Sequence, residues 1–332
     1  MALEDVYLDT FGSGALPLSE SNLEIREALI DAIPPLDRPV YESAAEAFWL
    51  ADDDLVLGYL GDRAYAYPIR ILNFHEIVND EIDGVPVLVS YCPLCRSGVV
   101  FDRRLGDQVL TFGNTSALYD SDLVMFDRQT GTYWWQVPGR GIVGTLSGEE
   151  LTALPSVTTT WAVWKTTYPD TVVLSRETGF TRPYDRDPFV GYAESLDSGS
   201  FPFPVSAAAT DDRLRAAEVV LGVAIAGSHR VYPLGILGDA AFNDEIEGTP
   251  LVILSRLAGP SGAAYSAVIG NRQLTFETRD GEVFDLETDS RWTFGGLAVE
   301  GELAGETLEA LPSRTTFWFA YVAAFPEATI GG

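Results

Sequence analysis

The chain has 332 residues, of which 49 are acidic and 21 basic, so its formal net charge at pH 7 is −28. A surface this negative disfavours nucleic acids and anionic membranes as partners, because both carry charge of the same sign. The length exceeds what one hydrophobic core usually serves, so we expect two domains.

The acidic residues are spread along the whole chain, and Lys165 is its only lysine. This composition suits a salt-rich cytoplasm, where charges are strongly screened; a specific electrostatic role is the alternative. No apolar run approaches the roughly eighteen residues of a membrane span. The first residues carry acids where an export signal would carry bases and an apolar core. We therefore expect a cytoplasmic protein.

The spacing of apolar residues predicts a helix at residues 21–34, opened by a serine cap, and a second short helix at residues 43–50. Residues 55–69 are typical of a hairpin turning at Gly61-Asp62, and residues 71–82 of a short helix. Further strands are predicted at residues 85–91, 97–105, 108–113, 122–129, 132–137 and 171–175, and one more helix at residues 159–169. Many short strands with few helices indicate a β-dominated, mostly antiparallel α+β fold.

The second part of the chain repeats much of the first. NDEIDGVP at residues 79–86 recurs as NDEIEGTP at residues 243–250, and ALPS at residues 153–156 recurs at residues 310–313. Because order and spacing hold over more than a hundred residues, we expect a tandem duplication of one β domain. The expected organisation is an N-terminal helical extension (1–40), a first repeat (41–176), an irregular, aromatic-rich bridge packed across one or both repeats (177–212), and a second, structural repeat (213–332).

Residues that only the first repeat retains are candidates for function. The two cysteines, Cys92 and Cys95, become Arg256 and Gly259 in the second repeat. The other residues specific to the first repeat are His75, Met125, Asp102 and Arg103. The second repeat also lacks six residues from the region of TSALYDSD at residues 115–122.

The C-P-L-C-R-S-G order resembles a metal-binding knuckle, with Pro93 fixing the chain direction and Gly98 allowing it to fold back. Thiolate, imidazole and thioether form a soft ligand set, which favours Cu(I) or zinc. We therefore predict a soft-metal site at Cys92, Cys95, His75 and Met125. Glu76, Asp102 and Arg103 are further candidates for this site, and no nucleotide cofactor is expected.

Each of these residues also has a structural interpretation. Paired cysteines can be small core residues, a histidine can cap its helix, and a strand methionine is often core. Glu76 and Asp102 can be surface groups or members of ion pairs.

Three other functions use the same residues. A dithiol oxidoreductase would cycle Cys92 and Cys95, although the β-branched residues after them do not provide the helix that activates thioredoxin-like thiols. A thiol-dependent lyase would grip a soft electrophile such as a mercurial and protonate its carbon. A non-catalytic protein-binding scaffold would use the aromatic bridge as its surface. Whether the protein is an enzyme stays open at this point.

Three stretches, NFHEIVNDEIDGVPVLVSYCPLCRSGVVFDR, LYDSDLVMFDRQTGTYWWQ and RDPFVGY, resemble the domain-of-unknown-function family numbered 3179. The resemblance covers most of residues 50–290 and implies a grouping without an activity. The family's motif positions fall on His75, Glu76, Cys92, Cys95, Asp102, Arg103 and Met125. Many members of that family look exported, with an N-terminal signal, whereas the first residues of this sequence do not resemble one; the resemblance leaves the compartment open.

Overall fold

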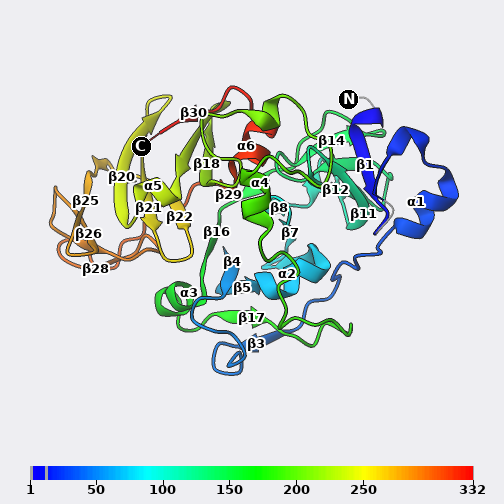
Figure 1. The fold of residues 1–332 in the computed structure, drawn as a ribbon. Helices are drawn as coiled ribbons and strands as arrows, with labels where there is room; N and C mark the ends of the chain where they lie inside the picture. The colour runs from blue at the N-terminus through cyan, green and yellow to red at the C-terminus, as the bar shows by residue number, and fades with distance from the viewer. Residues whose placement is uncertain (1–2, 12–13, 332) are drawn as a thin grey trace.

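A computed structural model describes residues 3–11 and 14–331 (Figure 1). Strands dominate and nearly all of their pairings are antiparallel, which confirms the β-dominated class. The α-helices are short: α1 Leu23–Leu29, α2 Ile69–His75, α3 Trp161–Thr167, α4 Tyr192–Asp197, α5 Leu234–Leu237 and α6 Trp318–Ala324. Three 3₁₀ turns are η1 Leu3–Asp5, η2 Leu18–Glu20 and η3 Ala208–Thr210. Within the described residues, no helix has the length and apolar character that crossing a bilayer requires.

The first half contributes two complete sheets. The five-stranded sheet has the order β16-β4-β5-β17-β3, formed by Ser156–Thr160, Leu55–Leu60, Ala64–Pro68, Val172–Leu174 and Tyr41–Ser43. The six-stranded sheet has the order β14-β13-β12-β11-β1-β2, formed by Arg140–Val143, Tyr133–Trp135, Asp122–Asp127, Phe112–Tyr119, Val6–Asp9 and Ala15–Pro17. The N-terminal extension thus adds two strands, besides α1, to a sheet of the first half.

The largest sheet crosses from one half of the chain to the other. Its order is β30-β19-β18-β29-β8-β7-β6, with β15 also paired to β8. The strands from the second half are β30 Thr329–Ile330, β19 Ser228–Pro233, β18 Val219–Ile225 and β29 Ser313–Phe317. Those from the first half are β8 Ser97–Asp102, β7 Val85–Cys92, β6 Ile77–Ile82 and β15 Ala153–Leu154. The two halves therefore share backbone pairing.

Four small sheets complete the fold. They are β20-β21-β22 (Ala240–Ile246, Thr249–Arg256, Ser261–Ser266), β25-β26-β27-β28 (Phe276–Arg279, Glu282–Asp285, Arg291–Trp292, Ala298–Glu300), β9-β10 (Arg104–Leu105, Gln108–Val109) and β23-β24 (Val268–Ile269, Arg272–Gln273).

The same succession of pairings occurs in both halves. In the first half β4 pairs with β5 and β16, and β17 joins β5 in parallel. In the second half β18 pairs with β19 and β29, and β30 joins β19 in parallel. β4 and β18 each contain a Leu-Gly pair, and both glycines have the same steric explanation. A Cβ on Gly58 would lie 2.2 Å from the Trp164 ring, and one on Gly222 would lie 1.7 Å from the Tyr321 ring.

Two predicted helices are wrong. Residues 44–50 form turns after β3, and the predicted helix at residues 71–82 is divided between α2 and β6. Glu76 separates these two elements in a left-handed conformation with φ 57°. The spacing of apolar residues does not distinguish a helix from a strand here, because Ile77, Val78 and Ile82 are buried on both faces of β6. The predicted hairpin at residues 55–69 is confirmed.

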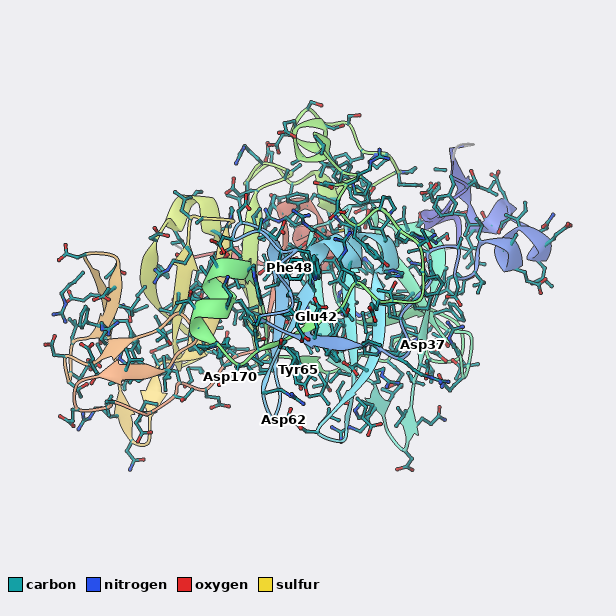
Figure 2. The ribbon with its side chains drawn as sticks, turned by 90° about the horizontal axis from the view of Figure 1, so that it is seen from below. Asp37, Glu42, Phe48, Asp62, Tyr65 and Asp170 are labelled. Carbon is teal, nitrogen blue, oxygen red and sulfur yellow. The ribbon has the colours of Figure 1, made fainter. Side chains whose placement is uncertain are left out.

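The acidic residues are not gathered into one patch on the face that Figure 2 shows. Asp37, Glu42, Asp62 and Asp170 lie apart from one another on it. The single lysine, Lys165, lies 3.4 Å from Asp52, and both side chains are exposed. Exposed pairs of this kind contribute about 0–1 kcal/mol each and do not hold the fold together.

The β8–β29 junction joins the halves directly beside the cysteines. The carbonyl of Cys95 accepts hydrogen bonds from the Phe317 amide at 2.8 Å and from the Thr316 hydroxyl at 3.0 Å. In the shared order of pairings, β16 of the first half holds the place of β29 and β22 of the second half that of β8, and β16 and β22 lie next to each other. In the described part of the chain they form no ladder, and the Thr159 hydroxyl, which corresponds to that of Thr316, has no partner.

The two threonines offer a matched test, since both are completely buried. Thr316→Val removes a made hydrogen bond, so the free energy of unfolding is expected to fall by about 1 kcal/mol. Thr159→Val removes a buried hydroxyl that makes no hydrogen bond. The free energy of unfolding is therefore expected to equal or exceed that of the wild type. Urea denaturation of both variants measures the difference. Equal destabilisation by the two substitutions would contradict the junction described here.

Candidate metal centre

The hairpin formed by β7 and β8 brings the two cysteines to the same place. Cys92 ends β7, opposite Ser97 at the start of β8. The connecting turn is closed by a hydrogen bond from the Cys95 amide to the Cys92 carbonyl at 3.2 Å. The left-handed residue that folds the chain back is Arg96, with φ 50°. Gly98 has another purpose: a Cβ there would lie 3.0 Å from the Leu57 side chain.

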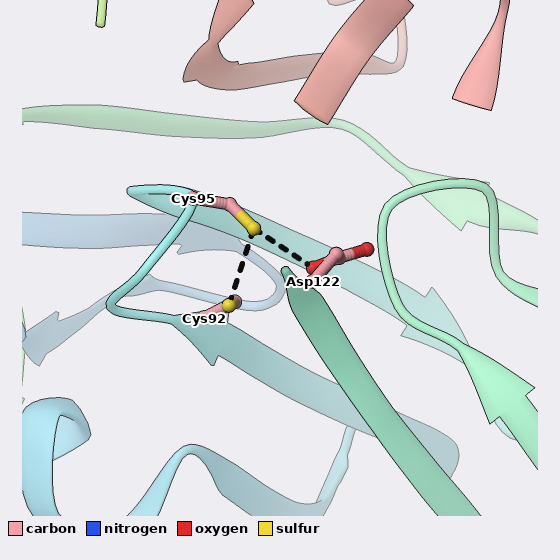
Figure 3. Close-up of side chains that lie close together, drawn as sticks. All are labelled: Cys92, Cys95 and Asp122. Carbon is pink, nitrogen blue, oxygen red and sulfur yellow. Dashed lines mark hydrogen bonds between the residues drawn. The ribbon is translucent and has the colours of Figure 1, made fainter. Parts of the chain in front are cut away.

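The two sulfurs meet a carboxylate (Figure 3). Cys92 Sγ and Cys95 Sγ are 3.3 Å apart, and Cys95 Sγ lies 3.2 Å from Asp122 Oδ1. One ligand atom from each of these residues lies within 4.8 Å of the other two. The cysteines are free thiols, because a disulfide requires a sulfur separation near 2.05 Å. We call Cys92, Cys95 and Asp122 the thiol–carboxylate cluster.

Backbone amides fix the Asp122 carboxylate in its orientation. Asp122 is the first residue of β12; its Oδ1 accepts from the Leu123 amide at 2.8 Å and its Oδ2 from the Val137 amide at 2.9 Å. The Ser121 carbonyl lies 3.3 Å from Cys95 Sγ on the same side. The cluster thus draws on β7, the turn after it and the start of β12.

Burial favours the protonated forms of the three groups in the cluster. All three side chains are at most 1% exposed. Loss of solvation raises the pKa of the Cys92 thiol, raises the pKa of the Cys95 thiol well above its usual value, and raises the pKa of Asp122 to about 7. The amides facing Asp122 lower its pKa and offset part of this effect. A cation bound between the three groups would stabilise their charged forms.

A tyrosine of the bridge, Tyr192, packs against the core that contains the cysteines. Burial raises the pKa of Tyr192, and the charges of Cys95 and Cys92 raise it further. The Tyr192 hydroxyl is buried and has no hydrogen-bond partner among the described residues. The bridge also bonds to the turn before β12, because the Ser121 hydroxyl donates to the Phe203 carbonyl at 3.1 Å.

His75 does not join the thiol–carboxylate cluster. Its Nδ1 lies 2.8 Å from the Pro34 carbonyl and its Nε2 lies 2.7 Å from the Tyr184 hydroxyl. Both ring nitrogens are therefore engaged, and desolvation lowers the pKa of the ring. In this arrangement His75 ties the N-terminal extension and the bridge to α2.

Glu76 and Met125 lie in the layer around the cluster. The Asn114 amide donates to Glu76 Oε2 at 2.6 Å, and loss of solvation raises the pKa of Glu76 to about 8. The charge of Glu76 is among the causes that raise the pKa of Cys92. Met125 is completely buried in the same core as the cysteines. Side chains alternate along a strand, so Met125 points away from the face that carries Asp122.

Asp102 and Arg103 lie far from the sulfurs. Asp102 pairs with Val87, five pairs along the hairpin from Cys92, or roughly 16 Å. Burial by itself would raise the pKa of Asp102. The salt bridge to Arg104 and the hydrogen bond from the Arg104 amide outweigh burial, so the pKa of Asp102 is lowered. The Arg103 guanidinium donates to three backbone carbonyls, those of Val87, Leu110 and Asp80. Both residues organise the open end of the hairpin.

Asp122 was missed from the sequence, although one signal pointed to it. It is the last residue of TSALYDSD, the region in which the second repeat is six residues shorter. The alignment that places Met125 on Val283 places Asp122 on Asp280, so Asp122 lies beside the shortened segment and is not marked as specific to the first repeat.

Comparison with known proteins gives one family. The family described as "Protein of unknown function (DUF3179)" matches residues 30–328. No curated protein and no solved structure matches the chain.

The buried carboxyl makes the stability of the metal-free protein depend on pH. The pKa of Asp122 is about 7 in the folded state and has a reference value of 3.8, so between these pH values the folded state holds a proton that the unfolded state has released. The stabilisation is complete below about pH 4 and is lost as the pH rises to about 7. Its upper limit is on the order of 4 kcal/mol.

This dependence is measured by urea denaturation of the chelator-treated wild type and of Asp122→Asn between pH 4 and 8. We expect the stability of the wild type relative to the variant to fall across pH 4–7 and to level off above it. Parallel curves would show that Asp122 titrates normally.

Proposed function

The chain belongs to the DUF3179 family, whose description gives no activity, and we propose from the geometry that it is a soft-metal-binding protein. Cys92, Cys95 and Asp122 supply two thiolates and one carboxylate to the ion. The observation that carries this proposal is the convergence of these three ligand atoms within 4.8 Å.

The distances suit one bound ion. Zinc–sulfur bonds of about 2.3 Å and zinc–oxygen bonds of about 2.0–2.2 Å place tetrahedral ligands roughly 3.5–3.8 Å apart. The sulfur–sulfur and sulfur–oxygen separations are 3.3 and 3.2 Å, so the ligands need to spread by only a few tenths of an ångström. The two amides on Asp122 keep its carboxylate oriented toward the sulfurs, as outer partners do in metal sites.

The ligand set favours zinc over Cu(I). Thiolates accept either ion, but a carboxylate is a harder ligand and is a common partner of zinc. Three protein ligands leave a fourth position, for which the Ser121 carbonyl, 3.3 Å from Cys95 Sγ, is a candidate. His75 and Met125 stand outside the proposed set, because the His75 nitrogens are engaged and Met125 points to the other face of β12.

The raised thiol pKa values weigh against a dithiol oxidoreductase. Such an enzyme needs one thiol with a lowered pKa, and burial has the opposite effect on Cys92 and Cys95.

A thiol-dependent lyase gains support from Asp122, whose pKa of about 7 lets it carry a proton beside the sulfurs. In that reaction the two thiolates bond the mercury of an organomercurial, the mercury–carbon bond breaks, and the carbon takes its proton from Asp122. With phenylmercury the expected product is benzene, measured by gas chromatography, and Asp122→Asn is expected to slow its release at least about tenfold, within the range of general acid catalysis. No benzene above the rate of free dithiol would rule this reaction out.

We also propose that the two halves arose by tandem duplication and that the first carries the function. The equal order of strand pairings and the two glycines beneath aromatic rings support this origin. The hydrogen bonds from β29 to the Cys95 carbonyl support a covering role for the second half. For the acidic composition we propose adaptation to a salt-rich cytoplasm, supported by the net charge of −28.

Metal titration tests the proposed site. Chelator-treated wild type is expected to bind one zinc or cobalt ion per chain, with a thiolate-to-cobalt absorption band. At pH 7 binding releases about two to three protons, because both thiols and part of Asp122 start protonated. Calorimetry in buffers of different ionisation enthalpy counts these protons.

The chain supplies a matched pair of controls. Cys92→Ser and Cys95→Ser are expected to weaken binding by more than about a hundredfold, which exceeds the usual effect of an outer partner. Asp122→Asn is expected to weaken it at least about tenfold, whereas Asp102→Asn, at the far end of the same hairpin, leaves it unchanged. Equal affinities in all four variants would overturn the proposed site.

A further inference from the structure

A cavity lies between the two halves, away from the cysteines, where β16 and β22 run side by side (Figure 1). Its volume is about 270 Å³. Residues of β4, β16 and α3 line it from the first half, and residues of β22 and the segment before β29 line it from the second. We call it the seam cavity.

The open seam contrasts with its counterpart on the other side of the fold. There β8 and β29 are joined by hydrogen bonds that use the Thr316 hydroxyl. Between β16 and β22 the described residues show no such ladder, and the Thr159 hydroxyl is left without a partner. One junction between the halves, β8 with β29, is therefore joined by hydrogen bonds, whereas the other, β16 with β22, borders a cavity.

The walls of the seam cavity are aromatic and uncharged. Tyr59, Trp164, Tyr168 and Tyr265 line it, and none of the lining residues is acidic or basic. This neutrality is unusual in a chain with 49 acidic residues. The polar atoms of two rings are already used, because Trp164 Nε1 donates to Thr171 and the Tyr265 hydroxyl donates to the Phe294 carbonyl, both at 2.9 Å.

One buried hydroxyl in the wall lacks a partner. Ser156 is 7% exposed, and its Oγ has no hydrogen bond within the described structure. Ser313, which is 2% exposed, lines the same cavity. These are the serines of the two ALPS segments, so both copies of that repeated motif contribute to the cavity. A buried hydroxyl without a partner costs about 1–3 kcal/mol, which a ligand can recover by bonding to it.

We propose that the seam cavity binds a small neutral molecule with a flat ring and one hydrogen-bonding group, of the phenol class. The ring packs between the aromatic side chains, and its polar group bonds to Ser156 Oγ. An apolar cavity of about 150 Å³ accommodates benzene, so 270 Å³ has room for a substituted ring. A charged ligand is disfavoured because no lining residue compensates its loss of solvation.

Three probes of equal shape test this site: p-cresol, toluene and 4-methylbenzoate, each titrated into the full chain and followed by NMR. We expect p-cresol to bind more tightly than toluene and 4-methylbenzoate not to bind. Ser156→Ala is expected to weaken p-cresol about threefold to tenfold, the effect of one neutral hydrogen bond, and to leave toluene unchanged. Ser147→Ala, an exposed serine outside the cavity, serves as the matched control.

A second variant keeps the test decisive. Leu60 lines the cavity and is 45% exposed, so Leu60→Trp fills its mouth without disturbing the core. We expect this variant to lose p-cresol binding while keeping the circular dichroism spectrum of the wild type. Absence of p-cresol binding to the wild type at millimolar concentration, binding that survives in Leu60→Trp, or equal affinity for p-cresol and toluene would each overturn the proposal.

Discussion

The carbonyl of Cys95 is the point on which the two halves of the protein meet. It accepts a backbone and a side-chain hydrogen bond from β29, and through this contact the sheet of the second half continues into β8, β7 and β6. The same residue contributes a sulfur to the thiol–carboxylate cluster. The turn that carries the cysteines is consequently held by a strand of the second half, which itself contains no cysteine.

Charge explains the character of the cluster. Three groups that ionise to anions lie together, away from water, and the described residues place no cationic side chain in a salt bridge with them. Such groups remain neutral, as the raised pKa values of Cys92, Cys95 and Asp122 indicate, or they bind a cation that compensates them. The proposed metal site is the second of these outcomes. Hydrogen bonds from two amides orient Asp122 in advance and reduce the cost of forming the site.

The two junctions, each formed by one strand from either half, differ. Where β29 meets β8, the strands are joined by backbone pairing and by hydrogen bonds to the Cys95 carbonyl. Where β16 meets β22, the hydroxyls of Ser156, Thr158 and Thr159 have no partner among the described residues, and a neutral cavity lies between the strands. The hydrogen-bonded junction of β8 and β29 couples the packing of the second half to the cluster in the first half. The junction of β16 and β22 leaves a space between its strands.

The sequence alone determined the β-dominated class, the hairpins and the residues that distinguish the two parts of the chain. These follow from local rules, namely the alternation of apolar residues and the positions of turn residues. It identified Cys92 and Cys95 because C-x-x-C spacing joins two sulfurs within one turn. It did not identify Asp122, because that carboxylate lies 27 residues beyond Cys95 and reaches the sulfurs from β12, a strand of a different sheet.

Only the tertiary structure determined which of the other candidate residues lie near the cysteines. His75 is nearer in sequence to Cys92 than Asp122 is to Cys95, yet its two nitrogens are taken by Pro34 and by Tyr184 of the bridge. Asp102 and Arg103 follow the cysteines closely, but an extended hairpin carries them roughly 16 Å away. Residue types and spacing therefore limit which chemistry is available. Contacts between distant segments decide which of those groups share one site, because each buried polar group must find a partner wherever the fold places it.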